Sequence, residues 1–278
     1  MLVCINGKNL CEQENVALKP AMRELFSGSV GGNSVTVRYS SISKQGGREI
    51  NEDSLYCGHK GDSYCFLVAD GLGGHGKGEV ASQLAASCFA KTFLETQEET
   101  ERFLCQAFTA AQEEILKEQK AAGLMNDMKT TGVALAIIHG VVQWAHVGDS
   151  RLYAFKKNKV VQRTLDHSVP QMLVLAGDIR EKQIRNHPDR NRLLRVIGVE
   201  WEEPRYVLSD EYSMDEFQAF LLCSDGFWEL IDEKKMGSFL KKSSSPEEWL
   251  EKMCGLVEKN GKGRNMDNYT AVAVWLEE

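Results

Sequence analysis

One stretch of the chain, residues 64–76, most constrains what the sequence can fold into. Its first part, residues 64–69, is apolar throughout and predicts a buried strand. That strand ends on Asp70, and four glycines follow within the next six residues. From Gly78 onward apolar residues recur at three- and four-residue spacing, which predicts a helix. We therefore expect Asp70 at the mouth of a strand, on a backbone that can approach a ligand closely.

Three interpretations of this stretch compete. A tight Asp-Gly turn is the simplest, because such pairs favour turns. Gly71, Gly73 and Gly76 also match the dinucleotide-binding pattern G-x-G-x-x-G, but a second helical pattern follows where that fold needs a strand. A nucleotide P-loop fails because the lysine after the last glycine precedes another glycine instead of Ser or Thr. The third interpretation makes Asp70 a metal ligand, and it requires partner carboxylates elsewhere.

Composition excludes several classes of protein. The length of 278 residues fits one large domain or two small ones. The net charge of -7 argues against a nucleic-acid-binding or anionic-membrane surface. No apolar run approaches the roughly 20 residues of a membrane helix, and the N-terminal run is too short for a signal peptide. None of the eight cysteines is paired at C-x-x-C spacing, so we expect reduced thiols in a cytoplasmic protein.

The N-terminal part of the chain has no predicted function. Residues 1–34 are interpreted as an N-terminal extension of unknown role, and the glycine- and serine-rich residues 27–34 predict a flexible link. Residues 35–40 alternate in polarity and predict the first strand of a domain that comprises residues 35–278.

Antiparallel strands are predicted after two helical patterns within residues 78–120. The apolar runs 133–138 and 141–147 are joined by a His-Gly pair, which is a hairpin signal. The runs 152–155 and 160–163 are expected to continue this meander through a second short turn. Because short turns require antiparallel strands, a doubly wound parallel sheet is excluded.

The second half of the chain predicts a flap and a further helix between strands. Residues 171–198 carry short helical pieces and several basic residues, which is typical of a mobile flap. An apolar strand follows at 217–223. Ser245 and Pro246 then match an N-cap and first helical position, with Glu248 as the capping-box acid.

Acidic residues recur at or beside the ends of the predicted strands. The set comprises Asp70, Asp225 and Asp267 beside strand ends and Glu52, Asp53 and Asp149 in adjoining loops. Each alone is explained by a turn or a solvated loop. Together they suit a two-cation site, because carboxylate, carbonyl and water ligands select magnesium or manganese. Two such ions ~3.5–4 Å apart can hold a hydroxide for attack on phosphorus, and Arg48 can bind an anion beside them.

Six motifs in order resemble the protein phosphatase 2C family of metal-dependent serine/threonine phosphatases, with the closest likeness to its bacterial branch. The motifs are Arg48-x-x-Asn51-Glu52-Asp53, Asp70-Gly71-x-Gly73-Gly74-His75, Thr130-Thr131-Gly132, Gly148-Asp149-Ser150-Arg151, Ser224-Asp225-Gly226 and Asp267-Asn268. The resemblance covers about residues 35–278.

The resemblance implies an α+β fold in four layers, α-β-β-α, with two antiparallel sheets face to face and helix pairs outside. It implies a hydrolase that removes phosphate from phosphoserine and phosphothreonine with metal-activated water. The implied cofactors are two Mn or Mg ions and a third, weaker one. The implied partners are phosphoproteins, including a cognate serine/threonine kinase and its substrates, with no nucleic acid, no membrane and a monomeric chain.

The resemblance also implies a role for each site residue. The implied metal ligands are Glu52, Asp70, the Gly71 carbonyl, Asp149, Asp225 and Asp267. Asp70 would bridge both ions, Asp225 and Asp267 would hold the first, Glu52 the second and Asp149 the third. Asp53 would orient metal-bound water, and Arg48 would bind the substrate phosphate.

One position departs from the family pattern. Many eukaryotic members have His, a proposed general acid, directly after the Asp-Gly pair, but this chain has Leu72 there. His75 comes three residues later and does not inherit the acid role, so leaving-group protonation has no assigned residue. Two alternatives to an active enzyme are a pseudophosphatase that only binds and a phosphatase-like domain that docks partners through residues 1–34. Loss of a ligand carboxylate would favour the first, but every expected carboxylate is present.

Overall fold

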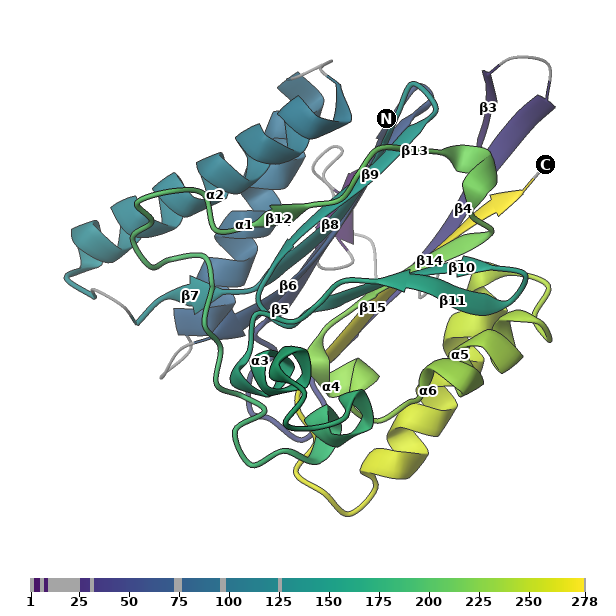
Figure 1. Cartoon of the computed structure of the whole chain (residues 1–278). Coiled ribbons are helices and arrows are strands. Elements are labelled where there is room, and N and C mark those ends of the chain that lie inside the picture. The colour runs from purple at the N-terminus through teal and green to yellow at the C-terminus, as the bar shows by residue number, and fades with distance from the viewer. Residues whose placement is uncertain are drawn as a thin grey trace.

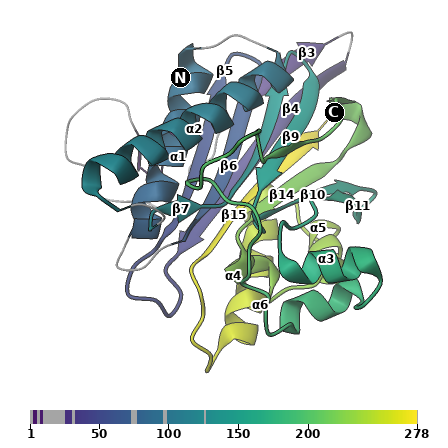
Figure 2. The same ribbon diagram turned by 60° about the vertical axis from the view of Figure 1, so that its left-hand side comes forward.

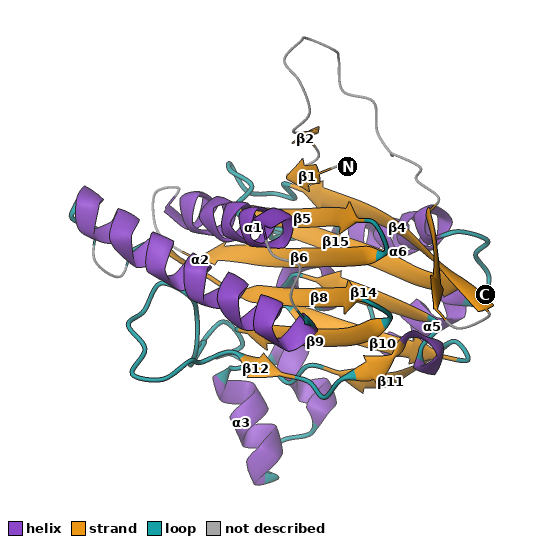
Figure 3. Cartoon of the chain, turned by 90° about the horizontal axis from the view of Figure 1, so that it is seen from above, coloured by secondary structure: helices purple, strands orange, loops and turns teal. Residues whose placement is uncertain are grey.

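Two antiparallel β-sheets pack face to face, and helices cover the outer face of each sheet (Figure 1). The structure is a computed structural model that describes residues 3–5, 8–9, 26–30, 33–72, 77–95, 99–124 and 127–277. The four-layer α-β-β-α arrangement predicted from the sequence is confirmed, and Figure 3 shows the helices outside the layered strands.

The first sheet is built around a strand that is apolar on both faces. Cys65 and Leu67 of this strand pack under the helices, whereas Phe66 and Val68 point into the core between the sheets. Successive side chains of a strand point to opposite faces, so a strand covered on both sides is continuously apolar. In order across the sheet, the strands are β12 (Val207–Leu208), β9 (Val141–Val147), β8 (Gly132–Ile138), β6 (Ser63–Leu72), β5 (Asp53–Lys60), β1 (Val3–Ile5) and β2 (Lys8–Asn9), with β7 (Lys129–Thr130) beside β6 and β13 (Tyr212–Ser213) beside β9.

The second sheet brings the last strand of the chain beside the first long one. In β15 and β4 the paired residues run from Tyr269 opposite Lys44 to Glu277 opposite Thr36. In order across the sheet, the strands are β11 (Lys159–Arg163), β10 (Arg151–Lys156), β14 (Ala219–Cys223), β15 (Tyr269–Glu277), β4 (Asn33–Lys44) and β3 (Phe26–Val30).

The predicted four-strand meander is wrong in one respect, because its two hairpins belong to different sheets. β10 does not continue beside β9 but pairs with β14, with Arg151 opposite Cys223. The chain crosses between the sheets at residues 148–150. Gly148 has a φ of 97°, and a Cβ there would lie 2.6 Å from the Thr131 side chain, so only glycine fits this crossing.

Each sheet is covered by its own pair of helices. Helix α1 packs against β5 and β6 with the fully buried residues Ala81, Ala85 and Phe89, whose mostly small side chains let helix and sheet approach closely. The first pair is α1 (Lys77–Glu95) and α2 (Thr100–Ala122), and the second is α5 (Glu233–Leu240) and α6 (Pro246–Gly261). Within the described ranges, no helix has both the length and the apolar character needed to span a lipid bilayer.

The predicted start of α6 is confirmed except for its acid. The Ser245 hydroxyl accepts a hydrogen bond from the Glu248 amide, and Pro246 occupies the first turn. The Glu248 carboxylate, however, accepts from the amide and hydroxyl of Ser244, at 2.7 and 2.8 Å, so it caps one residue earlier than a capping box requires.

Three strand boundaries differ from the sequence prediction. Within the predicted flexible link at residues 27–34, residues 27–30 and 33–34 form strands instead, because β3 pairs with β4 from Phe26 opposite Val37 to Val30 opposite Asn33. β4 consequently begins before residue 35. β6 continues two residues past Asp70, since its last two residues pair with β7. Residues 10–25 of the predicted extension lie outside the described residues.

The flap predicted at residues 171–198 lies within residues 164–206, the segment between β11 and β12, and we use the name flap for this whole segment. It contains α3 (Val169–Ala176) and the 3₁₀ helix η1 (Glu181–Asn186). Figure 2 shows α3 close to α4 (Asp225–Trp228), the short helix that follows β14. The buried Ile184 of η1 packs into the core under α5 and α6, so the flap contributes to the second helical layer.

Candidate metal centre

The acidic residues predicted from the sequence lie at one end of both sheets. Asp53 is the first residue of β5 and stands opposite Asp70 of β6 in the ladder. Asp149 lies in the crossing between the sheets. Asp225 begins α4 directly after β14, and Asp267 precedes the neighbouring strand β15. Asp149, Asp225 and Asp267, which flank strands of the second sheet, therefore face the ends of β5 and β6 in the first sheet.

One buried hydrogen-bond chain ties the two sheets together at this end. The Ser224 hydroxyl donates to Asp53 Oδ2 at 2.7 Å and accepts from the Thr270 amide at 3.0 Å. All three residues are buried. Because Asp53 belongs to the first sheet and the other two to the second, this chain fixes the spacing of the sheets at the acidic cluster.

The two threonines of the Thr-Thr-Gly motif hold the main chain of Asp70. Thr131 Oγ1 accepts from the Asp70 amide at 3.0 Å, and the Thr130 hydroxyl donates to the Asp70 carbonyl at 2.8 Å. Thr131 Oγ1 also lies 2.8 Å from the Ser150 hydroxyl, next to Asp149. The motif thereby links two of the acids, a role that the sequence analysis did not assign to it.

Asn268 holds the loop that precedes β5. Its Oδ1 accepts from the Glu52 amide at 2.9 Å, and its Nδ2 donates to the carbonyls of Gln45 and Ile50 at 2.8 and 2.9 Å. The loop lies close against the segment that precedes β15, since a Cβ on Gly46 would lie 2.1 Å from the Asp267 carbonyl oxygen. The position of Glu52 in the cluster is thus fixed by Asn268, which directly precedes β15 of the other sheet.

The backbone also approaches Glu52 from the other side. A Cβ on Gly78, in the first turn of α1, would lie 2.6 Å from the carbonyl carbon of Gly71 and 2.8 Å from Glu52 Oε1. The Gly71 amide donates to the Glu52 carbonyl at 3.1 Å. The glycines after the strand therefore permit close packing here, and residues 73–76, including His75, lie outside the described residues.

Five carboxyls of the cluster hold their protons more tightly than isolated carboxyls do. Burial raises the pKa of Asp53 to about 7 and that of Asp225 to about 6. For Asp70 and Asp149, burial and then the neighbouring acids raise the pKa well above its ordinary value. Burial also raises the pKa of Glu52. Like charges this close are stable only when protons or cations neutralise them.

The donor atoms of the cluster fit hard divalent cations. Three carboxylate oxygens, Glu52 Oε1, Asp53 Oδ1 and Asp225 Oδ1, are buried and have no hydrogen-bond partner in the described part of the chain. Leaving a buried polar group unsatisfied costs about 1–3 kcal/mol, and more for a charged group. An oxygen-only set of this kind is the ligand type that Mg²⁺ and Mn²⁺ prefer.

The side chains are not yet arranged around one point. Among the described residues, no three His, Cys, Asp or Glu side chains are placed to hold a single ion as they stand. Asp267 is turned toward Arg48, whose Nη2 donates to Asp267 Oδ2 at 2.6 Å. Side-chain rotation is therefore needed for this carboxylate to join a shared ligand set.

Glu229 is an acid of this region that sequence reasoning missed. Burial and then the Asp225 charge raise the pKa of Glu229 to about 7. Its carboxylate pairs with Arg190 of the flap, with Nε 3.1 Å from Oε1. The signal in the sequence was its position four residues after Asp225, which places both on one face of a helical turn.

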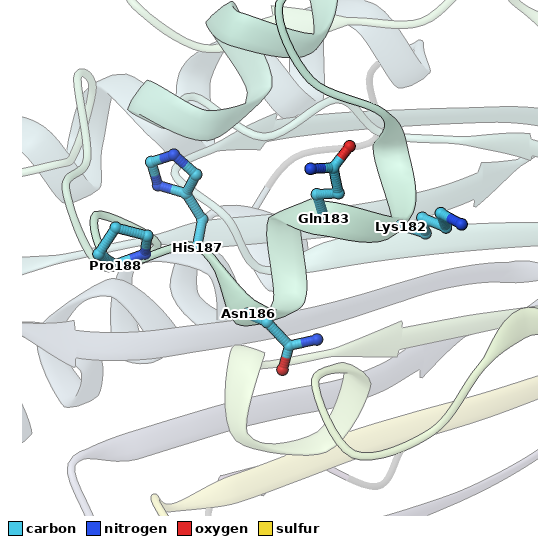
Figure 4. A pocket seen from close by; sticks show the side chains of 5 residues that line it. All are labelled: Lys182, Gln183, Asn186, His187 and Pro188. Carbon is cyan, nitrogen blue, oxygen red and sulfur yellow. The ribbon is translucent and has the colours of Figure 1, made fainter.

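A concave surface on the flap is separate from the acidic cluster. It has a volume of about 450 Å³ and is lined by Lys182, Gln183, Asn186, His187 and Pro188, none of which is a predicted site residue. Figure 4 shows Gln183 and His187 on one side of the turn and Asn186 on the other, so these side chains diverge instead of converging on a ligand.

Comparison with known proteins shows a family and a fold that this chain resembles. The family model described as Protein phosphatase 2C matches residues 43–266. The serine/threonine phosphatase stp of Listeria monocytogenes serotype 4b is 33% identical over 223 residues, which cover 78% of this chain and 86% of that protein. The serine/threonine protein phosphatase PstP of Mycobacterium tuberculosis is 30% identical over 242 residues, 86% of this chain and 45% of that longer protein.

Solved structures share the fold along most of the chain. The crystal structure of M. tuberculosis PstP/Ppp superposes with a TM-score of 0.74 at 28% identity, covering 87% of this chain and 99% of that chain. The PstP catalytic domain in complex with 2 manganese ions gives a TM-score of 0.73 at 26% identity and covers 88% and 100%. Staphylococcus aureus Stp1, at 23% identity and a TM-score of 0.77, covers 96% and 100% and supports the fold alone.

Proposed function

The chain belongs to the protein phosphatase 2C family of metal-dependent serine/threonine protein phosphatases, and we propose that the acidic cluster between its two sheets is the catalytic centre. The enzyme acts on phosphoproteins with two Mn or Mg ions as cofactors. One observation carries the proposal: three buried carboxylate oxygens, from residues of both sheets, have no hydrogen-bond partner among the residues that the structure describes.

We assign the ligands by position in the cluster. Asp70, which lies opposite Asp53 and beside Asp225, would contact both ions together with the Gly71 carbonyl. Asp225 and Asp267 would hold the first ion, and Glu52 would hold the second. When bound, the ions supply an activated water molecule for in-line attack on phosphorus and neutralise charge on the phosphoryl group.

Two further side chains act around the ions. Asp53 accepts from the Ser224 hydroxyl through one oxygen and leaves the other, Oδ1, without a partner, so it can orient water by hydrogen bonding. Asp149 lies in the crossing between the sheets, outside the ladder that pairs Asp53 with Asp70, and is assigned to the third, weaker ion.

Arg48 is the residue proposed to bind the substrate phosphate. Its guanidinium is 46% exposed and pairs with a carboxylate that is 36% exposed, so an arriving phosphate can replace that partner. A phosphate accepts two parallel hydrogen bonds from a guanidinium as a carboxylate does. Substrate binding would therefore free Asp267 to turn toward the first ion.

The test combines metal removal with stereochemistry. Treatment with EDTA should abolish hydrolysis of a phosphothreonine peptide, and Mn²⁺ or Mg²⁺ should restore it. Direct attack by water without a phosphoenzyme should invert the configuration of a chiral phosphate. Full activity after exhaustive metal removal would refute the metal centre, whereas retention of configuration or a trapped phosphoenzyme would refute the single displacement alone.

Two buried cysteines, Cys65 and Cys223, offer no competing nucleophile. Burial raises the pKa of the Cys65 and Cys223 thiols above the ordinary thiol range, and a reactive cysteine needs the opposite shift. All six cysteines whose side chains the structure describes are free.

As part of this proposal, the enzyme is a cytoplasmic monomer whose substrates include a cognate serine/threonine kinase and the targets of that kinase. Light scattering tests the oligomeric state, and phosphoproteomics after loss of the gene tests the substrates.

A further inference from the structure

Trp228 lies where α4, the crossing between the sheets and the flap meet. Its side chain is 2% exposed, and its indole Nε1 donates to the main-chain carbonyl of Asp149 at 3.0 Å. It is also the last residue of α4, the four-residue helix that begins with Asp225. A displacement of the Trp228 side chain would therefore affect the positions of two acids of the proposed centre, Asp149 and Asp225.

The first flap attachment lies against the indole ring of Trp228. The Arg151 guanidinium carbon is 3.4 Å from the ring centroid. The same guanidinium donates to both oxygens of Asp166, at 2.7 and 2.6 Å, and both side chains are 1% exposed. Because Asp166 lies at the start of the flap, this buried pair fastens the beginning of the flap to β10 and to Trp228.

The second attachment comes from the middle of the flap. Arg185 of η1 donates through Nε to the Trp228 carbonyl at 3.1 Å and through Nη2 to the Ile231 carbonyl at 3.2 Å. Nη2 also pairs with Glu233 at 2.8 Å, and the guanidinium carbon lies 5.6 Å from the Trp228 ring centroid. Carbonyls at the end of a helix have no intrahelical partner, so the flap supplies the donors that complete this end of α4.

We propose that Arg185 and Trp228 are positioning residues that couple the seating of the flap to the placement of Asp149. The inference rests on the proposed function, because Asp149 is a metal ligand only there. Arg185 holds the main chain of Trp228, and the Trp228 indole holds the main chain of Asp149. Flap release withdraws the first contact, and the loss is transmitted through a single buried side chain to the ion that Asp149 helps bind.

Coupling between two sites is reciprocal. If seating the flap strengthens ion binding at Asp149, then ion binding must stabilise the seated flap by the same factor. Couplings of this kind typically amount to about 5- to 150-fold in affinity. The prediction thus has two independent measurements, the affinity for Mn²⁺ and the rate of hydrogen exchange in residues 181–192.

Three variants of the full chain separate coupling from simple stabilisation. Arg185→Ala removes the flap attachment. Trp228→Phe keeps an aromatic ring and the main-chain carbonyl at position 228, but it removes the indole N–H that donates to the Asp149 carbonyl. Arg192→Ala is the matched control, because Arg192 is an arginine of the same flap whose ion pair, with Asp189 at 3.6 Å, stays inside the flap and is 70% and 42% exposed.

Equilibrium Mn²⁺ binding and hydrogen exchange are measured on all variants without any assay of turnover. Arg185→Ala should raise exchange in residues 181–192 and lower the affinity for the weakest Mn²⁺ by five-fold or more. Trp228→Phe should lower that affinity by a similar factor while flap exchange in the Mn-free protein stays near the wild-type rate. Arg192→Ala should change neither. Saturation with Mn²⁺ should slow flap exchange in the wild type but much less in Trp228→Phe.

Two outcomes would overturn the coupling. One is an Arg185→Ala protein with a released flap and an unchanged affinity for the weakest ion. The other is equal protection of the flap by Mn²⁺ in the wild type and in Trp228→Phe, which remains measurable if Arg185→Ala fails to fold. A wild-type chain that binds no Mn²⁺ would instead refute the proposed metal centre, so the two failures are distinguishable.

Discussion

Removing Asp166 while Arg151 remains should be among the most destabilising single changes in this protein. Both side chains are 1% exposed, and they share two hydrogen bonds of 2.7 and 2.6 Å. Asp166→Ala would leave a buried guanidinium with the Tyr153 hydroxyl, 3.1 Å away, and the Trp228 ring as its partners. Breaking a buried ion pair from one side costs about 3–5 kcal/mol, because the remaining charge is uncompensated.

This loss of free energy of unfolding is measurable by urea unfolding and by thermal unfolding, both at fixed pH and fixed Mn²⁺ concentration. For a chain of this size, about 2–4 °C of melting temperature corresponds to each kcal/mol, so the midpoint of thermal unfolding should fall by roughly 6–20 °C. Asp189→Ala is the control, since it breaks the exposed pair with Arg192 at 3.6 Å. Exposed pairs contribute about 0–1 kcal/mol, so the control should stay close to the wild type.

A double replacement separates the charge from the packing. Arg151→Met with Asp166→Leu removes both charges and keeps apolar volume, so it should recover most of the free energy of unfolding that Asp166→Ala loses. An unsatisfied Tyr153 hydroxyl limits the recovery by about 1–3 kcal/mol. If Asp166→Ala loses no more stability than the Asp189→Ala control, the reasoning about the buried charge is refuted.

Four further predictions concern the acidic cluster. Burial raises the pKa of Asp53 to about 7 and that of Asp225 to about 6, so in EDTA the folded state binds more protons than the unfolded chain between pH 4 and 7. The free energy of unfolding should therefore fall as pH rises through this window, with a slope of about 1.4 kcal/mol per pH step for each extra proton that the folded state binds, and Mn²⁺ should cancel the fall; a flat profile in EDTA contradicts this. Arg48→Ala should bind two ions normally and lose kcat/KM, with Arg48→Lys recovering only part, because lysine lacks the bidentate fork; unchanged kinetics would make Arg48 an ordinary surface residue. Asp149→Ala should still bind two ions tightly, as measured by calorimetry, yet turn over slowly. Loss of one tightly bound ion would instead make Asp149 a ligand of one of those two ions. Gly78→Ala should weaken Mn²⁺ binding, because its Cβ would lie 2.6 Å from the carbonyl carbon of Gly71 and 2.8 Å from Glu52 Oε1. An unchanged affinity for Mn²⁺ would mean that α1 can shift without cost.

Local features of the fold were predictable, whereas sheet membership was not. The α6 start at Ser245 and the helices α1 and α2 depend on contacts within a few residues, which the spacing of the sequence records. The crossing at Gly148 was missed because apolar runs predict strands but do not say which sheet a strand joins. The link predicted at residues 27–34 failed for a related reason, since pairing with β4 outweighs the weak strand propensity of glycine and serine.

The candidate site follows the same division. The acids were identified because each stands beside the end of a predicted strand or in an adjoining loop, a position that the sequence shows directly, and their roles as ligands stay predictions. Glu229 was missed because its environment depends on Arg190, which reaches it from a flap 39 residues away in the chain. The pairing of Arg48 with Asp267 likewise depends on the packing of both sheets, so no local pattern announces it.

The position of the cluster between the sheets also determines when activity can appear as the chain folds. Ser224 and Asp53, which fix the spacing of the sheets, are 171 residues apart in the chain, and Arg48 and Asp267 are 219 residues apart. Contacts of such long range close large loops and form slowly, whereas the β8–β9 hairpin is local and can form early. During refolding, secondary structure should therefore return well before hydrolysis. The time course of returning turnover would record the moment at which the two sheets dock.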